Sequence, residues 1–274
     1  MKIGEYNTLK ILRDTKVGLF LGDDQQDVLL PKKYVPKEFF IGNEITVFLY
    51  LDHEERPVAT TLKPYVKLNE FAHLKVNYIN KFGAFLDWGL EKDLFVPFKE
   101  QAKQMEVGKR YLIYMYLDEQ TNRLAATSKV NKYFSEEISN FEPNEEVEVM
   151  ISHITDLGVN VIIENKFKGL VFSDEVFKDI KLGTKTKAYI KQVRPDGKID
   201  VTFKKIGLEA IDDDAALVLK ELKANNGFLG LHDKSHPEDI KTVLQMSKKA
   251  FKKAVGTLYK SRIIDIKDNG IFLK

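Results

Sequence analysis

A unit repeated three times along the chain constrains its fold more than any other feature. Three stretches can be superposed: VGLFLGDDQQDVLLP from Val17, FGAFLDWGLEKDLFVP from Phe82 and LGVNVIIENKFKGLVF from Leu157. Each has an apolar residue, a glycine and then an alternating strand. A second glycine in each copy opens another alternating strand, at Gly42, Gly108 and Gly183. A repeated sequence unit indicates a repeated structural unit, so we expect three copies of one small domain.

The hydrophobic pattern within each copy has a period of two, which predicts strands with one buried face. In the third copy the two faces are Val147, Val149 and Ile151 against Glu146, Glu148 and Met150. Segments rich in turn-forming residues separate the strands: DHEERP, DEQTNR and RPDGK. About five strands in each copy, with glycine where a strand must bend, favour a closed barrel of the oligonucleotide-binding (OB-fold) type over an open sheet.

The last part of the chain changes to a helical period. An apolar stripe that includes Ala215 and Leu222 predicts a helix that ends at Asn225-Asn226-Gly227, and the short strand FLGL follows it. At the end of the chain, two apolar strands flank Asp268-Asn269-Gly270, a strong signal for a tight hairpin.

Two more helices are expected between that short strand and the hairpin. Ser235 and Glu238 have the spacing of a capping box and predict a helix that runs through Met246. Ser247 is expected to cap the next helix. The order helix, strand, helix, helix, hairpin is that of a winged-helix domain.

The length of 274 residues is too great for one average domain and suits several small ones. We therefore expect a mainly β, multi-domain protein with three tandem five-stranded OB-fold barrels followed by an α+β winged-helix domain. The predicted domains are 1–65, 66–139, 140–206 and 207–274.

Composition excludes several classes of site and partner. Cysteine is absent, which excludes disulfides, thiolate zinc sites and cysteine nucleophiles. No apolar run approaches the roughly 20 residues that cross a bilayer, so we expect no membrane association and a cytoplasmic location. The formal net charge is only +2, so binding to nucleic acid must come from local clusters of Lys and Arg.

The second repeat has the residues that suit a nucleic-acid site best. In KFGAFLDWG, Phe82 and Phe85 stand around a glycine. Exposed on a barrel, such rings stack on the bases of a single strand, and Lys81, Lys99 and Arg123 can contact phosphates. The alternative is that these aromatic side chains fill the core of the barrel.

A second set of aromatic residues is predicted to face outward from the strand after the second glycine. Its members are Phe48 and Tyr50 in the first copy and Tyr114 and Tyr116 in the second, where Arg110 and Leu112 share the same face. The third copy has Lys185, Lys187, Tyr189 and Lys191 at these positions. An apolar outward face binds a ligand or packs against a neighbouring barrel, and the pattern leaves both open; the lysines fit contact with a nucleic-acid backbone better.

The second copy resembles the S-one domain, the RNA-binding domain repeated in the largest small-subunit ribosomal protein. FGAF, LFVPFKE, MEVGKR and Asp118 with NRLAATSK match that family in order. The resemblance implies that Phe82, Phe85 and Arg123 form an RNA-binding face. Many such domains have histidine where this chain has Pro97, which predicts a missing base contact.

The other copies are weaker matches to this S-one type of barrel. The first retains Phe20 and Arg56 as implied RNA contacts. The third retains Phe172 and Lys198, although Asn160 stands where an aromatic residue is expected. As a whole, three such barrels and a winged helix resemble the bacterial conserved virulence factor B family of RNA-binding regulators, which implies an influence on gene expression.

The predicted third helix of the winged-helix domain is strongly basic. Lys248, Lys249, Lys252 and Lys253 lie at helical spacing without an acidic residue among them. We expect them to contact nucleic-acid phosphates, with a solvated lysine surface as the alternative. Because Lys binds phosphate better than it discriminates bases, RNA is favoured over an operator DNA, which remains possible.

The sequence favours a binding protein over an enzyme. His232 and His236 are a weak pair without a third metal ligand, and no phosphate-binding glycine loop or nucleophile elbow is present. We expect no cofactor and no metal. The predicted function is binding of single-stranded or loop RNA through base stacking and phosphate contacts. The alternatives are a DNA-binding transcription regulator and a protein-interaction scaffold.

Overall fold

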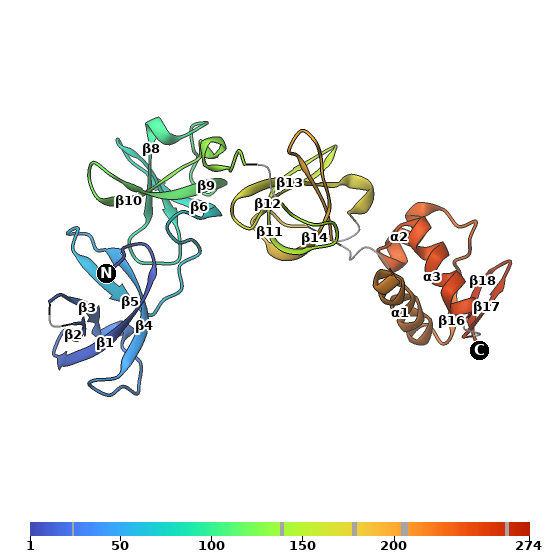
Figure 1. Cartoon of the computed structure of the whole chain (residues 1–274), viewed down its shortest axis with the longest axis horizontal. Coiled ribbons are helices and arrows are strands. Elements are labelled where there is room, and N and C mark those ends of the chain that lie inside the picture. The colour runs from blue at the N-terminus through green and yellow to red at the C-terminus, as the bar shows by residue number, and fades with distance from the viewer. Residues whose placement is uncertain (24, 138–139, 177–179, 204–207, 261–262) are drawn as a thin grey trace. The chain divides into compact units, whose positions relative to one another are not determined.

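Three five-stranded β units and a small domain of helices and strands follow one another along the chain (Figure 1). The structure is a computed structural model that describes residues 1–23, 25–137, 140–176, 180–203, 208–260 and 263–274. The chain divides into two compact units, Met1–Phe134 and Ser135–Lys274. The predicted fold class of tandem OB-fold barrels and a winged helix is confirmed. The domain boundaries predicted at 139 and 206 lie outside the described residues.

The first barrel is a closed sheet with the strand order β1-β2-β3-β5-β4. Its elements are β1 Tyr6–Thr15, β2 Gly18–Gly22, β3 Asp27–Pro31, the 3-10 turn η1 Lys32–Tyr34, β4 Glu44–Leu51 and β5 Pro57–Thr60. Parallel pairing of β3 with β5, at Leu29 and Val58, closes the barrel. Alternate residues point inward, and Leu19, Leu21 and Leu30 are completely buried.

The second barrel repeats this order of elements. They are β6 Phe71–Ile79, β7 Gly83–Asp87, β8 Leu94–Pro97, η2 Phe98–Glu100, β9 Arg110–Asp118, β10 Arg123–Thr127 and η3 Val130–Tyr133. The sheet has the order β10-β9-β6-β7-β8, and its end strands β8 and β10 are in contact. The predicted inward phase of β9 is confirmed, since Ile113 and Met115 are completely buried and Tyr111 packs against the core.

The third barrel is closed like the first, in the order β11-β12-β13-β15-β14. Its elements are β11 Glu146–Thr155, β12 Gly158–Ile163, β13 Phe167–Phe172, η4 Ser173–Glu175, β14 Lys185–Val193 and β15 Ile199–Thr202. The predicted inward residues of β11, Val147, Val149 and Ile151, are buried in its core. Met150, predicted on the opposite face, lies outside that core cluster but is also buried, as is its strand partner Ile162.

A β-bulge occurs at the same place in the first strand of every barrel. The register shifts lie between Ile11 and Arg13, between Val76 and Tyr78, and between Ile151 and His153. The second glycine of the repeat binds to the bulge. The N–H groups of Gly42, Gly108 and Gly183 donate to the carbonyls of Ile11, Val76 and Ile151 at 2.8, 2.9 and 2.8 Å. All three glycines have positive φ, which explains why glycine recurs there.

The first glycine of the repeat is required by the close approach of two strands. A Cβ atom on Gly18, whose φ is +143°, would lie 2.1 Å from the carbonyl oxygen of Leu30. We expect Gly18→Ala to lower the free energy of unfolding by roughly 2–4 kcal/mol, because the clash and the unfavourable dihedral add. Urea unfolding monitored by circular dichroism measures this effect.

The matched control is a glycine with space around it. Gly256 lies inside helix α3 (Lys248–Lys260), and a Cβ atom there would have no neighbour within 4 Å. We expect Gly256→Ala to raise the free energy of unfolding of its domain by about 0.5–1 kcal/mol, because alanine favours the helix. A Gly18→Ala variant as stable as the unchanged chain would contradict the close-approach argument.

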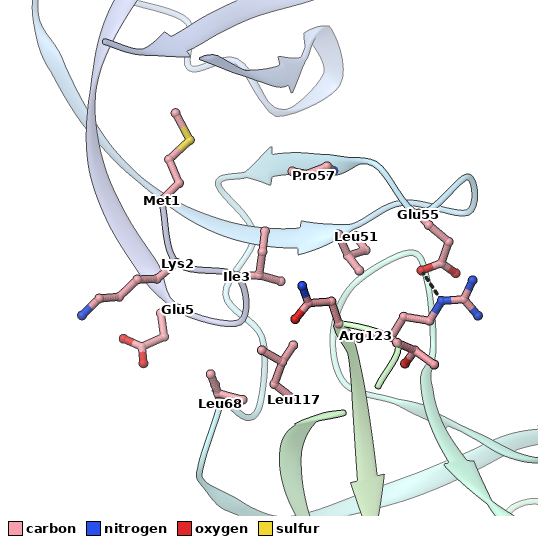
Figure 2. A pocket seen from close by; sticks show the side chains of 12 residues that line it. Met1, Lys2, Ile3, Glu5, Leu51, Glu55, Pro57, Leu68, Leu117 and Arg123 are labelled. Carbon is pink, nitrogen blue, oxygen red and sulfur yellow. Dashed lines mark ion pairs between the residues drawn. The ribbon is translucent and has the colours of Figure 1, made fainter. Parts of the chain in front are cut away.

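The first two barrels meet around a cavity of about 550 Å³ (Figure 2). Side chains from both barrels line it, among them Leu51 and Arg123. Glu55 of the first barrel forms ion pairs across the joint with Arg123 and with Lys92, each at 3.1 Å. The Lys92 ammonium also donates to the carbonyl of Asp52 at 2.7 Å. Polar contacts therefore tie the two barrels together at this edge.

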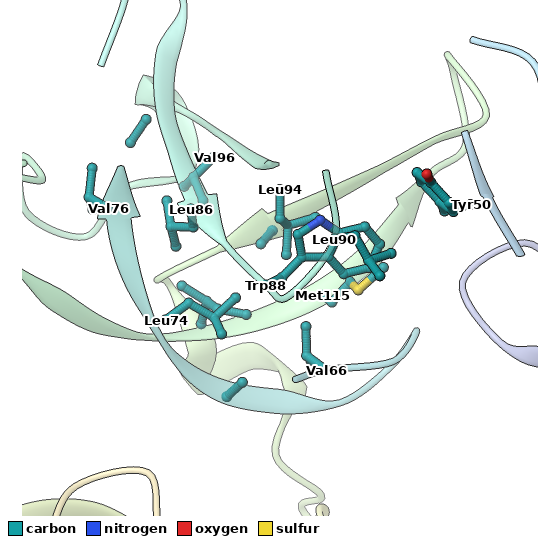
Figure 3. Close-up of a cluster of buried hydrophobic side chains, with 14 of the residues drawn as sticks. Tyr50, Val66, Leu74, Val76, Leu86, Trp88, Leu90, Leu94, Val96 and Met115 are labelled. Atoms are coloured by element: carbon teal, nitrogen blue, oxygen red, sulfur yellow. The ribbon is translucent and has the colours of Figure 1, made fainter. Parts of the chain in front are cut away.

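Beside this polar edge, one hydrophobic core runs from the first barrel into the second. Phe48 and Tyr50 of β4 and Trp88 and Leu90, which follow β7, belong to the same buried cluster. Figure 3 shows Tyr50, Trp88 and Leu90 in it, with Val66 from the connection between the barrels. The Trp88 ring meets the rings of Phe48 and Tyr50 edge-on, at centroid distances of 5.8 and 6.3 Å. The two barrels therefore form one packed body.

The C-terminal domain has the predicted winged-helix order. Its elements are α1 Leu208–Ala224, β16 Phe228–Leu229, α2 Pro237–Leu244, α3, β17 Ile264–Lys267 and β18 Gly270–Leu273, with the sheet order β16-β18-β17. As predicted, α1 ends in left-handed residues, Asn226 and Gly227, and the Gly227 N–H donates to the Leu222 carbonyl. The Ser247 cap is also confirmed, because its hydroxyl accepts from the Ala250 N–H at 3.1 Å.

The predicted capping box at Ser235 and Glu238 was wrong. The N-cap of α2 is His236, whose ring nitrogen accepts from the Glu238 N–H at 3.4 Å. The Ser235 hydroxyl instead accepts from the His232 N–H at 2.9 Å. The reason is Pro237, which favours the first helical position and so makes the residue before it the cap.

Candidate nucleic-acid interface

Three aromatic side chains form a row across adjacent strands of the second barrel. Tyr78 on β6 pairs with Phe85 on β7, and Phe85 pairs with Phe95 on β8. The Tyr78 and Phe85 rings are stacked, with centroids 4.5 Å apart and planes 8° from parallel. The Phe85 and Phe95 centroids are 5.0 Å apart. We call Tyr78, Phe85 and Phe95 the aromatic row; Tyr78 is exposed and the other two are half-buried.

Of these three residues, only Phe85 was predicted as a site residue. Tyr78 faces Phe85 because of the bulge after Val76, which shifts the strand register by one residue. Simple alternation along β6 does not indicate that shift. Phe95 lies opposite Phe85 because of the register in which β7 pairs with β8. The FGAF motif alone does not define that register.

Phe82, the other predicted stacking residue, lies at the end of the same strands. It precedes β7, its side chain is exposed, and its carbonyl accepts from the N–H of Phe98, which follows β8. Phe98 is also exposed, and the sequence reasoning missed it. The Lys81 ammonium lies 5.0 Å from the centre of the Phe82 ring. Lys99, predicted to contact phosphate, is exposed next to Phe98.

An acidic side chain, Asp93, lies two residues from Phe95 of the aromatic row and is partly buried. Asp93, which precedes β8, accepts from the Asn77 side chain at 2.9 Å. Burial raises the pKa of Asp93, and the Asn77 hydrogen bond only partly offsets this.

Arg123, the third residue implied by the S-one resemblance, lies at the joint between the barrels. It begins β10, and its guanidinium forms the ion pair with Glu55 at 3.1 Å (Figure 2). Its side chain remains more than half exposed. To contact a phosphate, the Arg123 guanidinium would have to leave Glu55 or bind the phosphate and Glu55 together. The structure therefore places Phe82 just before β7 and Phe85 within it, but ties Arg123 to the first barrel.

The first barrel has the same row with different residues. Arg13 pairs with Phe20, and Phe20 pairs with Leu29. The Arg13 guanidinium lies 4.1 Å from the centre of the Phe20 ring and forms an ion pair with Asp27 at 2.7 Å. A planar guanidinium thus replaces the Tyr78 ring of the second barrel.

Arg56, the other predicted contact of the first barrel, forms ion pairs with two acidic neighbours. Its guanidinium donates to Asp52 at 2.8 and 3.0 Å and pairs with Glu54 at 2.9 Å. Although burial opposes it, hydrogen bonding by Arg56 lowers the pKa of Asp52. These interactions fold the turn between β4 and β5 and reduce the positive charge that Arg56 presents.

In the third barrel the row contains no aromatic benzene ring, with His153, Asn160 and Leu170 in register. Phe172 ends β13 at the position of Pro97 in the second barrel, since both pair with the first glycine of their repeat. The Arg194 guanidinium lies 5.5 Å from the centre of the Phe172 ring.

Arg194 is held in place by a buried carboxylate and was missed by the sequence reasoning. Asp200, whose side chain is only 3% exposed, pairs with it at 2.8 Å and also accepts from Gln192. The predicted contact Lys198 is exposed and pairs with Asp196 at 2.8 Å. Arg194 is therefore the better oriented cation beside Phe172.

The two interpretations of the outward aromatic face are resolved differently along the chain. Phe48 and Tyr50 pack in the joint between the barrels, so the packing interpretation is correct for them. On β9, Tyr114 stacks on Tyr133 of η3 with centroids 3.9 Å apart, and Tyr116 stacks on the same ring. The chain therefore covers this face itself. Burial raises the pKa of Tyr116 to about 12.

The corresponding lysines of the third barrel are exposed, and two of them have acidic partners. Lys187 pairs with Glu146 and Lys191 with Glu175. The hydrogen bond to Glu146 is the main cause of the raised pKa of Lys187. Lys185 is exposed as well. These pairs reduce the positive potential expected from the sequence.

The basic residues of α3 contrast with these paired lysines. Lys249, Lys252 and Lys253 are exposed and Lys248 is half-buried. Considering only the residues that the structure describes, none of the four forms an ion pair. Their charge is available to an anionic partner.

The described residues contain no cluster of three or more His, Asp or Glu side chains that could hold a metal ion. His232, one of the weak pair considered above, accepts from the Lys234 N–H through its ring nitrogen at 3.1 Å. Within the same described residues, no helix has the length and apolar character needed to span a membrane.

Comparison with protein families identifies two kinds of domain. Residues 3–62 and 70–129 match the S1 domain, the S-one domain named above, and these segments cover the first and second barrels. Residues 216–273 match the CvfB-like winged helix domain.

The chain also has relatives over most of its length. It is 28% identical over 270 residues to the uncharacterized protein YitL of Bacillus subtilis strain 168, covering 95% of this chain and 90% of the relative. It is 29% identical over 243 residues to conserved virulence factor B of Staphylococcus aureus strain N315, covering 86% and 81%. A crystal structure of a multidomain protein with nucleic acid binding domains from Streptococcus pneumoniae TIGR4 aligns over 99% of this chain and 98% of its own, with 24% identity and a TM-score of 0.43.

Proposed function

The chain belongs to the conserved virulence factor B family, as its S1 domains, its CvfB-like winged helix domain and its relatives show, and on this premise we propose that it binds single-stranded or loop RNA. The observation that carries the proposal is the aromatic row of the second barrel. Stacked, partly exposed rings on adjacent strands are a platform for bases, and the row lies in a domain of the S1 type.

The aromatic row binds RNA through base stacking, with phosphate contacts beside it. Each base of a flexible strand can stack on an exposed ring face, and the lysines around Phe82 and Phe98 attract the phosphates between the bases. The exposed ring of Phe82 extends the platform beyond the row. Because every base has an aromatic face, this mechanism tolerates many RNA sequences.

The first and third barrels extend the path of the RNA with weaker sites. In the first, the stacked Arg13 and Phe20 can accept a base or a phosphate. In the third, Arg194 beside Phe172 serves the same purpose. The chain acts as a binding protein and not as an enzyme, and it influences gene expression in the cytoplasm by occupying RNA.

Fluorescence anisotropy with labelled single-stranded RNA and with duplex DNA of matched length tests the proposal, at two salt concentrations. We expect tighter binding to the single strand. Preference for the duplex would instead favour a DNA-binding regulator that acts through the winged helix, and no binding to either would favour a protein-interaction scaffold.

The lysines of α3, which form no ion pair with any residue that the structure describes, give a separate, quantitative prediction. We expect Lys252→Gln together with Lys253→Gln to reduce the slope of log affinity against log salt by about 0.7 for each lysine that no longer neutralises a phosphate, roughly 1.4 in total. The control is Lys220→Gln with Lys223→Gln, which removes the same charge from exposed positions on α1. Equal slopes for both variants would show that α3 has no special role.

A further inference from the structure

The outer face of the small sheet in the winged-helix domain has an aromatic pair of its own. Phe228 on β16 and Phe272 on β18 are directly opposite each other in the sheet register. Their ring centroids are 4.7 Å apart with planes at 36°. Phe228 is 40% exposed, and Phe272 is partly exposed.

These rings do not belong to the core of the domain. The neighbours of the two phenylalanines along the strands, Leu229 and Ile271, point to the other face of the sheet and are buried in the helical core. The Phe228 ring lies over backbone instead, since a Cβ atom on Gly270 would approach it to 2.9 Å. The sheet therefore holds two aromatic rings on the face away from its own core.

Charged groups surround the aromatic pair. The Lys267 ammonium lies 4.6 Å from the centre of the Phe272 ring. Asp265, the partner of Phe272 on β17, forms an ion pair with Lys274 at 3.1 Å. Asp265 is thus matched by Lys274, and Lys267 is the ammonium group that lies against the Phe272 ring.

This composition fits a base-stacking site better than the centre of a protein interface. Interface centres are enriched in aromatic residues but depleted of Lys and Asp, and they extend over many apolar side chains. Single-strand binding sites instead combine a few aromatic rings with cations placed to meet the phosphates on either side of a base. Two rings with Lys267 beside them match the second description.

We propose that Phe228 and Phe272, with Lys267, form a second base-stacking site, which binds a nucleotide of the same single-stranded RNA. This inference rests on the proposed function of the chain. It gives the winged-helix domain a contact with unpaired bases through its sheet, in addition to the phosphate contacts expected from α3.

Photochemical crosslinking of the full-length chain to a single-stranded RNA of about 30 nucleotides containing 5-iodouridine tests this site directly. Tryptic cleavage places Phe228 in the peptide 224–234 and Phe272 in the peptide 268–274, so mass spectrometry separates them from the aromatic row. We expect RNA adducts on at least one of these two peptides. We also expect Phe228→Leu with Phe272→Leu, which retains apolar packing, to reduce affinity about fivefold.

The control is Ile266→Ala, which removes an exposed apolar side chain from the same hairpin; its affinity should stay unchanged. Adducts on the peptides of the second barrel alone, with unchanged affinity of the double leucine variant, would overturn this inference and leave the proposed function intact. Absence of RNA binding by the unchanged chain would overturn both. Equal loss of affinity in the double leucine variant and in Ile266→Ala would indicate a structural effect and would also overturn the inference.

Discussion

Replacing Phe82 and Phe85 together by alanine is expected to weaken the binding of single-stranded RNA about tenfold or more. Stacking contributes roughly 1–3 kcal/mol for each base, and about 1.4 kcal/mol corresponds to a tenfold change in affinity. The exposed Phe82 ring and the Phe85 ring at the centre of the aromatic row are both removed. Fluorescence anisotropy with a labelled single strand measures the loss.

Phe40→Ala is the matched control for this double variant. Phe40 is 71% exposed in the first barrel, lies in the loop before β4 and is not part of the Arg13–Phe20 pair, so we expect its removal to leave RNA affinity unchanged. Because Phe85 also contacts Tyr78 and Phe95, circular dichroism must show that the double variant is folded. A folded double variant that binds RNA as tightly as the unchanged chain would contradict the site.

The second large effect concerns stability. Phe48→Ala is expected to lower the free energy of unfolding of the first two barrels by about 3–5 kcal/mol. Phe48 is completely buried between Tyr6 and Trp88, with ring centroids 5.4 and 5.8 Å away, so its removal opens a cavity at the joint. Urea unfolding monitored by the fluorescence of Trp88, the only tryptophan, measures the loss of stability. Trp88 packs against Phe48, so its fluorescence reports on the joint itself.

Phe40→Ala is also the control for this stability prediction, because it removes the same type of side chain from an exposed position of the same barrel. Its effect should be within about 0.5 kcal/mol. If Phe48→Ala were equally mild, the shared core would contribute little, and the two barrels would be joined mainly by the ion pairs of Glu55.

The barrels were predictable because the hydrophobic residues of their strands alternate over short stretches and their glycines recur. The joint between them was only half predictable. Alternation along β4 indicated that Phe48 and Tyr50 face outward from the barrel, which is correct, but it contains no information about what covers them. Trp88 follows a strand within the aromatic motif, and only the tertiary structure shows that it fills the joint and lies away from the row.

The site was predicted in part, for a related reason. FGAF indicated Phe82 and Phe85, whereas Tyr78 and Phe95 depend on a bulge and on a cross-strand register. The ion-pair partners of the cationic side chains were the least predictable part of the site. A sequence shows where Arg56 and Arg123 stand but not that Asp52 and Glu55 engage them, because those ion pairs form across turns and between barrels.

The continuous core of the first two barrels has a thermodynamic consequence for RNA binding. A ligand that occupies only the native state adds about 2.7 kcal/mol of stability at a concentration one hundred times its dissociation constant. Because Phe48, Tyr50 and Trp88 belong to one cluster, unfolding of the first barrel exposes the core of the second. The proposed binding of RNA to the aromatic row is therefore expected to protect strands β1 to β5 from opening, even where the RNA does not touch them. Binding to one barrel and the folding of its neighbour are thus linked through their shared buried core, in addition to the ion pairs of Glu55.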